Sequence, residues 1–410
     1  MNNDINMLER AIITPTFSGH FGYIKNYLKS FDRYLIDRDF PIFFIINKNE
    51  NSIFSPIIQK YRNRLNLNVI FLDDIFEHFK IDETPEEALS KYGRLSFQTL
   101  KKFYGALYVN AKEFLFLDSE SMLIKPTNIS LLFDDYFKKP TFFISRISER
   151  AQGFKENFTY EFLNAVTNLL GKKPEYWSIE SYEWFYKLDI LKDLINDLGT
   201  PIEIVKNYKM PGKFPNIEGI LEALLYYQYI LYHNDKYGYT IKIIEDELRE
   251  ALGDNNYKRF RQYFDKSPFF ICGVLETAMF FIDKDNADGF IHFLNKYKIR
   301  LLRVEDPKIN NATAQIKIIK NTGIHICPSS QNHIFGINST IKKRFNILIG
   351  NNRNIQKLKK HFTKFAKPFI FICKPFLATI KWMFEIIPIC IYSLKSLNIV
   401  LKNLKNILFG

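Results

Sequence analysis

The stretch that decides the fold is FLFLDSESMLIKP, residues 114–126. Four apolar residues run directly into Asp118, Ser119 and Glu120, and apolar residues then resume. This pattern is typical of a buried strand that ends in two carboxylates. A carboxylate taken out of water is costly unless it meets a cation, hydrogen-bond donors or water. The sequence around this strand indicates which of these it meets.

The composition describes a folded protein with a neutral body and a basic end. The chain has 410 residues, of which 47% are hydrophobic and 16% aromatic, enough for a sizeable core. Residues 341–410 hold 14 Lys and Arg against one acid, Glu385, and this equals the whole net charge of +13. Residues 1–340 are therefore electrically balanced, which argues against a nucleic-acid-binding body.

The cysteines and the amino terminus indicate the cellular compartment in which the protein is expected. The four cysteines are scattered and include no CxxC pair, so neither a zinc site nor a disulfide framework is indicated. The first ten residues, MNNDINMLER, are polar and lack the apolar segment of a secretory signal. We therefore expect a cytoplasmic, reducing environment.

Upstream of residue 114, apolar strands alternate with amphipathic helices. The expected strands are residues 11–16, 41–46, 69–72 and 114–117, and the expected helices are residues 23–34, 53–65 and 95–109. Continuous apolar strands separated by helices favour an α/β fold with a mainly parallel sheet, covered by helices on both faces.

Polar residues follow these strands. They are Thr14, Thr16, Asn47, Asp73, Asp74, Asp118 and Glu120. In parallel α/β sheets, ligands bind at the carboxyl ends of the strands, so we expect the site there. For Asn47 and Asp73 taken singly, an ordinary polar loop explains the residue equally well.

The helix before the fourth strand carries a basic face. Arg94, Gln98, Lys101 and Gly105 are three to four residues apart and share one side. Such a face beside two carboxylates suits a ligand that carries phosphate together with a divalent metal. The alternative is a solvated helix face, with Lys101 and Lys102 in water.

Together these features resemble the GT-A nucleotide-sugar glycosyltransferases of the bacterial surface-polysaccharide type. ITPTFSGHFGYIKNYLKSF, residues 13–31, resembles the family's opening strand, loop and helix, which hold the nucleotide. FLFLDSE resembles the strand that ends in the DxD motif, with Glu120 in place of the second Asp. The layout extends over residues 8–335, and the recognisable motifs cover about a third of that.

The resemblance implies a divalent metal, Mn²⁺ or Mg²⁺, and a set of donor-binding residues. Asp118 and Glu120 would hold the metal, which neutralises charge on the donor's diphosphate. The family often completes the metal shell with a carboxyl-terminal histidine, here His325, with His333 as the alternative. The implied donor-binding residues are Thr14, Thr16, Phe17, Asp73, Arg94, Lys101 and Asp118. Against this stand two plain alternatives: Asp118 caps the following turn, and His325 is a buried histidine with satisfied hydrogen bonds.

Catalytic and acceptor residues are less clearly marked. An inverting transferase needs a carboxylate base, and Glu218 and Glu222 lie one turn apart on an expected helix; a retaining enzyme would use neither. Aromatic side chains could stack on sugars, although a core role is as compatible with each of them. They are Tyr176, Trp177, Tyr182, Trp184 and Phe185.

Two domains are expected. Residues 1–340 form the GT-A-like domain, with a helical, acceptor-side insertion around residues 147–235. Residues 341–410 form a tail whose basic residues recur every seven positions between apolar ones, while prolines divide it into short helices. Its longest uncharged stretches are too short to span a bilayer, which takes about 20 apolar residues. The tail therefore suggests helices lying on an anionic membrane, or else docking on a partner protein.

The sequence thus predicts a transferase that moves a sugar from a nucleotide-sugar donor to a glycan or lipid-linked glycan acceptor. It would act as a peripheral protein at the cytoplasmic face of the membrane, without nucleic acid as a partner. The bacterial surface pathway comes from family analogy alone. The alternative is a non-catalytic GT-A-like protein that tethers an assembly to the membrane.

Overall fold

The structure is a computed structural model. It describes residues 7–149, 158–181, 183–208, 219–264, 275, 286–302, 318 and 320–327. All of them belong to one compact unit, Met1–Gly336. The predicted tail lies outside the described residues, as do Tyr182, Glu218 and His333.

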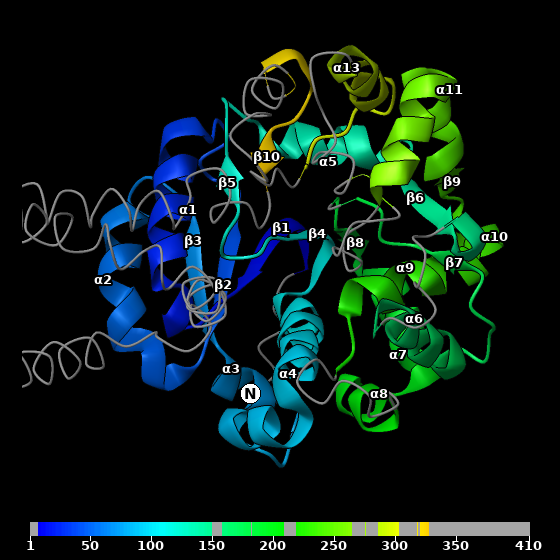
Figure 1. Ribbon diagram of the computed structural model, residues 1–410. Helices are drawn as coiled ribbons and strands as arrows, with labels where there is room; N and C mark the ends of the chain where they lie inside the picture. Colours follow the sequence, from blue (N-terminus) through cyan, green and yellow to red (C-terminus); the bar gives the residue numbers. More distant parts are fainter. Residues whose placement is uncertain are drawn as a thin grey trace, which may run out of the picture. The chain divides into compact units, whose positions relative to one another are not determined.

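A five-stranded sheet organises this unit (Figure 1). Its strand order is β3-β2-β1-β4-β8. The strands are β1 (Leu8–Pro15), β2 (Ile42–Ile46), β3 (Leu67–Phe71), β4 (Ala111–Phe116) and β8 (Phe185–Lys187). The first four are parallel and β8 is antiparallel to β4. The prediction of a mainly parallel sheet flanked by helices is confirmed.

The two faces of the sheet belong to two separate cores, because side chains alternate along each strand. In β1, Ala11 and Ile13 enter one core and Ile12 the other. Helices cover both faces (Figure 1). The helices before residue 140 are α1 (Phe21–Tyr34), α2 (Asn51–Arg62), α3 (Leu72–His78), α4 (Pro85–Val109) and α5 (Ile129–Phe137).

Helix α4 is longer than predicted and bent. It begins at Pro85, after a capping box between Thr84 and Glu87, ten residues before the expected start. Gly93 breaks the helical path with φ 75°, a conformation that glycine adopts readily. The segment after Gly93 corresponds to the predicted helix and leads into β4.

Two small sheets complete the described structure. The strands β7 (Tyr176–Trp177), β6 (Thr141–Arg146) and β9 (Thr240–Ile243) form one of them. The strand β5 (Met122–Leu123), which follows the DSE residues, pairs with β10 (Ile326–Cys327) in the other. His325 therefore lies just before the short strand β10.

The remaining helices follow residue 157. They are α6 (Phe158–Leu169), α7 (Leu188–Leu198), α8 (Pro201–Asn207), α9 (Glu222–Tyr232), α10 (Asn234–Tyr237), α11 (Ile244–Phe264) and α13 (Ala287–Lys296). The 3₁₀ helices are Ser18–His20, Lys48–Glu50 and Ile147–Glu149. The region expected to be a helical insertion, residues 147–235, also supplies β7 and β8, and β8 extends the central sheet. Within the described residues, no helix combines the length and apolarity needed to cross a membrane.

Candidate functional site

The candidate site lies where β1 and β4 end side by side. Ile13 of β1 pairs with Phe116 of β4, and the backbone N–H of Leu117 donates to the carbonyl of Ile13 over 3.1 Å. The loop after β1 and the DSE residues after β4 are therefore neighbours, as the sequence predicted. Ser121 N–H donates to the carbonyl of Asp118 over 2.9 Å and closes the DSE turn.

A buried lysine contacts the first carboxylate of the DSE turn. Lys102 Nζ lies 3.4 Å from Asp118 Oδ1 and forms a second ion pair with Glu222. The side chains of Lys102 and Glu222 are 1% and 3% exposed, whereas that of Asp118 is 24% exposed. Burial acts to lower the pKa of Lys102, but Asp118 and Glu222 outweigh it and the pKa is raised. Lys102 is thus a fixed cation, and Asp118 is the member of the group that solvent reaches.

Aromatic rings and a threonine complete the surroundings of this group. The Lys102 ammonium lies 5.0 Å from the ring of Trp184 and 5.6 Å from that of Phe116, distances at which a cation is attracted to a ring face. Thr99 Oγ1 donates to the carbonyl of Ile220 and lies 3.4 Å from Glu222 Oε2. These contacts fix the lysine and the glutamate from several elements.

The second residue of the DSE turn contacts the loop after β1. His20 Nδ1 lies 2.6 Å from Ser119 Oγ. Burial lowers the pKa of His20 to about 4, although the charge of Asp118 acts in the opposite direction. The imidazole is therefore neutral at physiological pH.

Lys101, the predicted phosphate-binding lysine, lies in a different place from Lys102. It is 6% exposed, and its Nζ donates to the carbonyl of Thr16 over 3.1 Å. Burial lowers its pKa to about 8, against the charges of Glu50, Asp73 and Glu86. Lys101 therefore belongs to the side of the site near the ends of β2 and β3, and Lys102 is the lysine beside Asp118. Both lysines are buried, so the alternative of a solvated helix face with Lys101 and Lys102 in water is wrong.

The other predicted donor-binding residues are distributed around the loop after β1. The Thr14 hydroxyl lies 3.3 Å from the Tyr27 hydroxyl, so it forms its contact with a buried side chain of the core. Phe17 is exposed at the surface, and the Arg94 guanidinium lies 5.9 Å from its ring. Asp73 lies in the first turn of α3, where its Oδ2 accepts from Lys48 N–H over 2.8 Å. The Phe17 ring lies 4.3 Å from that of His20, and the charge of Arg94 acts on the pKa of His20, so both residues adjoin the histidine that contacts the DSE turn.

Of the predicted catalytic pair, Glu218 lies outside the described residues, so the spacing of the two carboxylates stays a prediction. Helix α9 begins at Glu222, and Gly219 before it has φ 147°, so the helix starts later than the sequence suggested. A Cβ on Gly219 would lie 2.5 Å from Leu95 Cβ and 2.7 Å from Ser96 N, which explains the glycine beside α4. The role of Glu222 as a base stays a prediction, but its buried pairing with Lys102 favours neutralisation of that lysine.

The three predicted metal ligands do not converge. His325 Nδ1 lies 3.1 Å from Thr127 Oγ1, and burial, with the charges of Lys125 and Arg300, lowers the pKa of His325 to about 4. In the part of the chain that the structure describes, no three His, Cys, Asp or Glu side chains form a group able to hold a metal. His325 therefore does not form a metal site with Asp118 and Glu120. The alternative, a histidine whose ring is hydrogen-bonded within the protein, applies to it.

Most of the predicted sugar-stacking aromatics belong to the core. Trp177 and Phe185 are fully buried, and Trp184 is 9% exposed over Lys102. Tyr176 is half-buried and packs against the core in β7. The core interpretation, which the sequence left open, applies to Trp177, Trp184 and Phe185.

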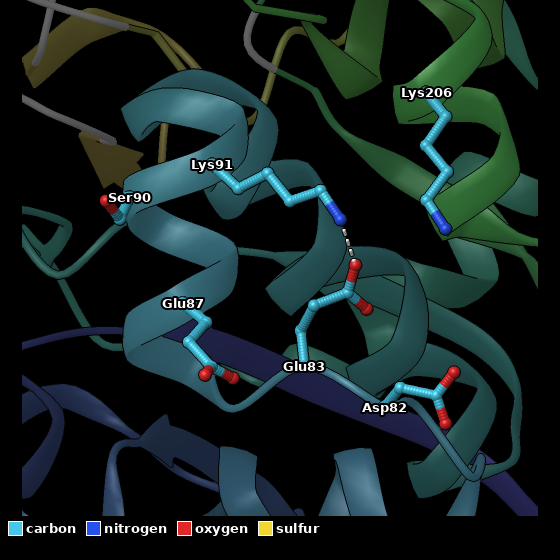
Figure 2. Close-up of a pocket in the computed structure, with 6 residues that line it drawn as sticks. All are labelled: Asp82, Glu83, Glu87, Ser90, Lys91 and Lys206. Carbon is cyan, nitrogen blue, oxygen red and sulfur yellow. Dashed lines mark hydrogen bonds and ion pairs between the residues drawn. The ribbon is translucent and has the colours of Figure 1, made fainter.

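Figure 2 shows a surface hollow that is separate from this site. It is lined by Asp82, Glu83, Glu87, Ser90, Lys91 and Lys206. Lys91 Nζ lies 2.7 Å from Glu83 Oε1, and hydrogen bonds from Lys91 and Tyr92 lower the pKa of Glu83 to about 2. No predicted site residue lines the hollow, and two of its charged side chains, Lys91 and Glu83, pair with each other. We assign it no role in the candidate site.

Comparison with known proteins gives structural likenesses only. The chain matches no protein-family model and no curated protein by sequence. It is similar to mouse xyloside xylosyltransferase 1 in its apo form, with 10% identity and a TM-score of 0.35, over 63% of this chain and 93% of that one. It is similar to core-mannan synthase A from Aspergillus fumigatus in its Mn/GDP form, with 8% identity and a TM-score of 0.34, over 55% and 70% of the two chains.

A third likeness is to TarS from S. aureus, with 14% identity and a TM-score of 0.27. The match covers 77% of this chain and 54% of that one, so the chain spans about half the length of TarS. Because all three TM-scores are below 0.5, these similarities carry no weight in assigning a function. The function is therefore argued from the site.

Proposed function

We propose that the protein is a metal-dependent, GT-A-type glycosyltransferase that moves a sugar from a nucleotide-sugar donor to a glycan or lipid-linked glycan. The observation that carries this proposal is the placement of Asp118. It stands at the carboxyl end of β4, beside the loop after β1, held by Lys102 and open to solvent. The carboxyl ends of parallel strands are where α/β folds bind their ligands.

Buried polar atoms near Lys101 fit a nucleoside. Thr16 Oγ1, Asn47 Oδ1 and Glu50 Oε2 are buried, and none has a hydrogen-bond partner among the described residues. Buried polar groups are nearly always hydrogen-bonded, so such atoms call for a partner. Ribose hydroxyls and the N–H groups of a base are partners of the right kind. Lys101 and the exposed Arg94 supply positive charge for the phosphates.

The donor set at the DSE turn fits a hard divalent cation. Asp118 and Glu120 offer carboxylate oxygens, the ligands that Mg²⁺ and Mn²⁺ prefer. Asp118 keeps its ion pair with Lys102 and is still 24% exposed, so a cation can approach its oxygens from solvent. A metal held there would neutralise the charge that develops on the leaving diphosphate. Lys102 then orients Asp118, and Arg94 attracts the donor.

The acceptor and the location are proposed from the sequence. The tail combines 14 basic residues with apolar ones, a composition suited to an anionic membrane surface. A lipid-linked glycan presented at that surface would meet an enzyme held there. We therefore place the reaction at the cytoplasmic face of the membrane.

Binding of nucleoside diphosphates tests the proposal. Isothermal calorimetry with UDP and with GDP, each with Mn²⁺ and with EDTA, should show binding of at least one of them that requires the metal. Binding that is lost in Asp118→Asn but kept in Asp74→Asn, an exposed carboxylate paired with Lys48, would place the metal site at the DSE turn. If neither diphosphate binds with Mn²⁺, the non-catalytic tether is favoured instead.

A further inference from the structure

His20 connects the two segments that make up the candidate site. It ends the 3₁₀ helix Ser18–His20 in the loop after β1, and its Nδ1 lies 2.6 Å from Ser119 Oγ in the turn after β4. Ser119 is 2% exposed. The contact joins residues 99 positions apart in the chain. Sequence reasoning assigned no role to either residue.

The position of the His20 ring is fixed by its neighbours. The ring centroid lies 4.3 Å from that of Phe17 and 5.1 Å from that of Tyr23, the latter in an edge-on arrangement. A Cβ on Gly19 would lie 2.3 Å from the Phe17 ring, so the glycine allows Phe17 to fold back towards His20. The loop sequence Phe-Ser-Gly-His therefore builds a rigid support for the imidazole.

Through its contact with Ser119, His20 can fix the position of both neighbouring carboxylates. It stands between Asp118 and Glu120 in a turn closed by the Ser121 N–H. Lys102 contacts Asp118 from the other side. The turn is thus held at Asp118 by a charge and at Ser119 by a hydrogen bond. Groups that bind ligands work best when neighbouring residues fix their geometry in this way.

We propose that His20 is a positioning residue for donor binding, which acts by holding Ser119 so that Asp118 and Glu120 face the metal–diphosphate. This inference rests on the proposed function. His20 needs no contact with the donor for this role. Its neutral ring can either donate to the serine oxygen or accept from the serine hydroxyl, and both tautomers hold the turn.

The test is a double-mutant cycle on metal-dependent binding of UDP or GDP, whichever the full-length protein binds with Mn²⁺. His20→Ala and Ser119→Ala should each weaken binding about tenfold, as expected for the loss of one hydrogen bond to a ligand-binding turn. The double variant should bind no more weakly than either single variant, because both remove the same contact. His20→Asn should recover most of the affinity, since its amide occupies nearly the place of Nδ1.

Thermal unfolding is measured for every variant, so that a change in binding is separated from a loss of fold. His78→Ala, at an exposed histidine of α3, is the matched control and should bind like the parent. If the parent binds but His20→Ala binds equally well, or if the two single losses simply multiply, the positioning role is wrong. If the parent binds neither diphosphate with Mn²⁺, the proposed function itself is wrong, and the positioning role of His20 is wrong with it.

Discussion

The ammonium of Lys102 lies 3.4 Å from Asp118 Oδ1 and also pairs with Glu222, while all three side chains come from different elements. One buried cation thus serves two carboxylates of unequal exposure. The fully buried Glu222 neutralises the lysine, and the partly exposed Asp118 is oriented by it.

Asp118→Ala should abolish turnover and leave the fold intact. Lys102 keeps Glu222 as its partner in this variant, so no buried charge is left alone. Glu120→Ala should be less severe if the metal is held partly through water. Turnover at saturating Mn²⁺ and the melting temperature are the two measurements. Activity near that of the parent in Asp118→Ala would rule out its metal role.

Lys102→Met should be strongly destabilising. It leaves Glu222 buried without its cation, and breaking such a pair costs about 3–5 kcal/mol. Lys102→Met with Glu222→Gln should recover much of that stability, because the stranded charge is gone. Metal-dependent binding of nucleoside diphosphate should stay weak, because Asp118 has lost its support.

The control for this pair is Lys48→Met, at an exposed lysine that pairs with Asp74. Exposed pairs contribute roughly 0–1 kcal/mol, so little change is expected in urea unfolding. A double variant at Lys102 and Glu222 with both full stability and full diphosphate binding would show that the pair serves the core alone.

Lys101 should give stability a pH dependence in the alkaline range. Burial lowers its pKa in the folded protein to about 8, from the 10.5 of an unperturbed lysine. Between these values the unfolded chain holds a proton that the native state has released, so stability rises with pH. The free energy of unfolding of the parent, relative to that of Lys101→Met, should therefore rise by on the order of 3 kcal/mol from pH 7 to pH 11. Urea unfolding at several pH values measures the free energy of unfolding of both proteins. The same pH dependence in the parent and in Lys101→Met would contradict the prediction.

The tail should bind the protein to anionic membranes. Each base near such a surface contributes about 1 kcal/mol, and 14 are available. Truncation after Ser339 should leave a body that still binds donor but no longer sediments with anionic vesicles. High salt should release the intact protein only in part, because apolar insertion is not screened. An intact protein that ignores anionic vesicles at low salt would show the membrane role to be wrong.

The strands and their carboxyl ends could be predicted because the signal is local. Apolar runs of four to eight residues, broken by polar ones, mark β1, β2, β3 and β4. Asp118 and the loop after β1 were therefore placed beside each other correctly. The three-residue strand β8 has no such signal, since its residues resemble any buried segment.

The contacts within the site could not be predicted in the same way. Adjacent lysines on a helix point about 100° apart, and only the packing of α4 after Gly93 decides that Lys102 faces Asp118. The start of α9 was misplaced because the periodic pattern continues through Gly219, although a glycine before a helix is a signal for a break. His20 was missed because its partner, Ser119, follows the neighbouring strand β4 and lies 99 residues further along the chain.

The most direct test of the central claim is turnover of a panel of nucleotide sugars by the purified full-length protein. Release of nucleoside diphosphate is measured with Mn²⁺ and with EDTA, beside Asp118→Asn. We expect one donor, or a small group that shares a nucleotide, to be hydrolysed slowly without acceptor, with the release lost in EDTA and in the variant. Release that is unchanged in EDTA and in Asp118→Asn would contradict a metal-dependent glycosyltransferase centred on the DSE turn.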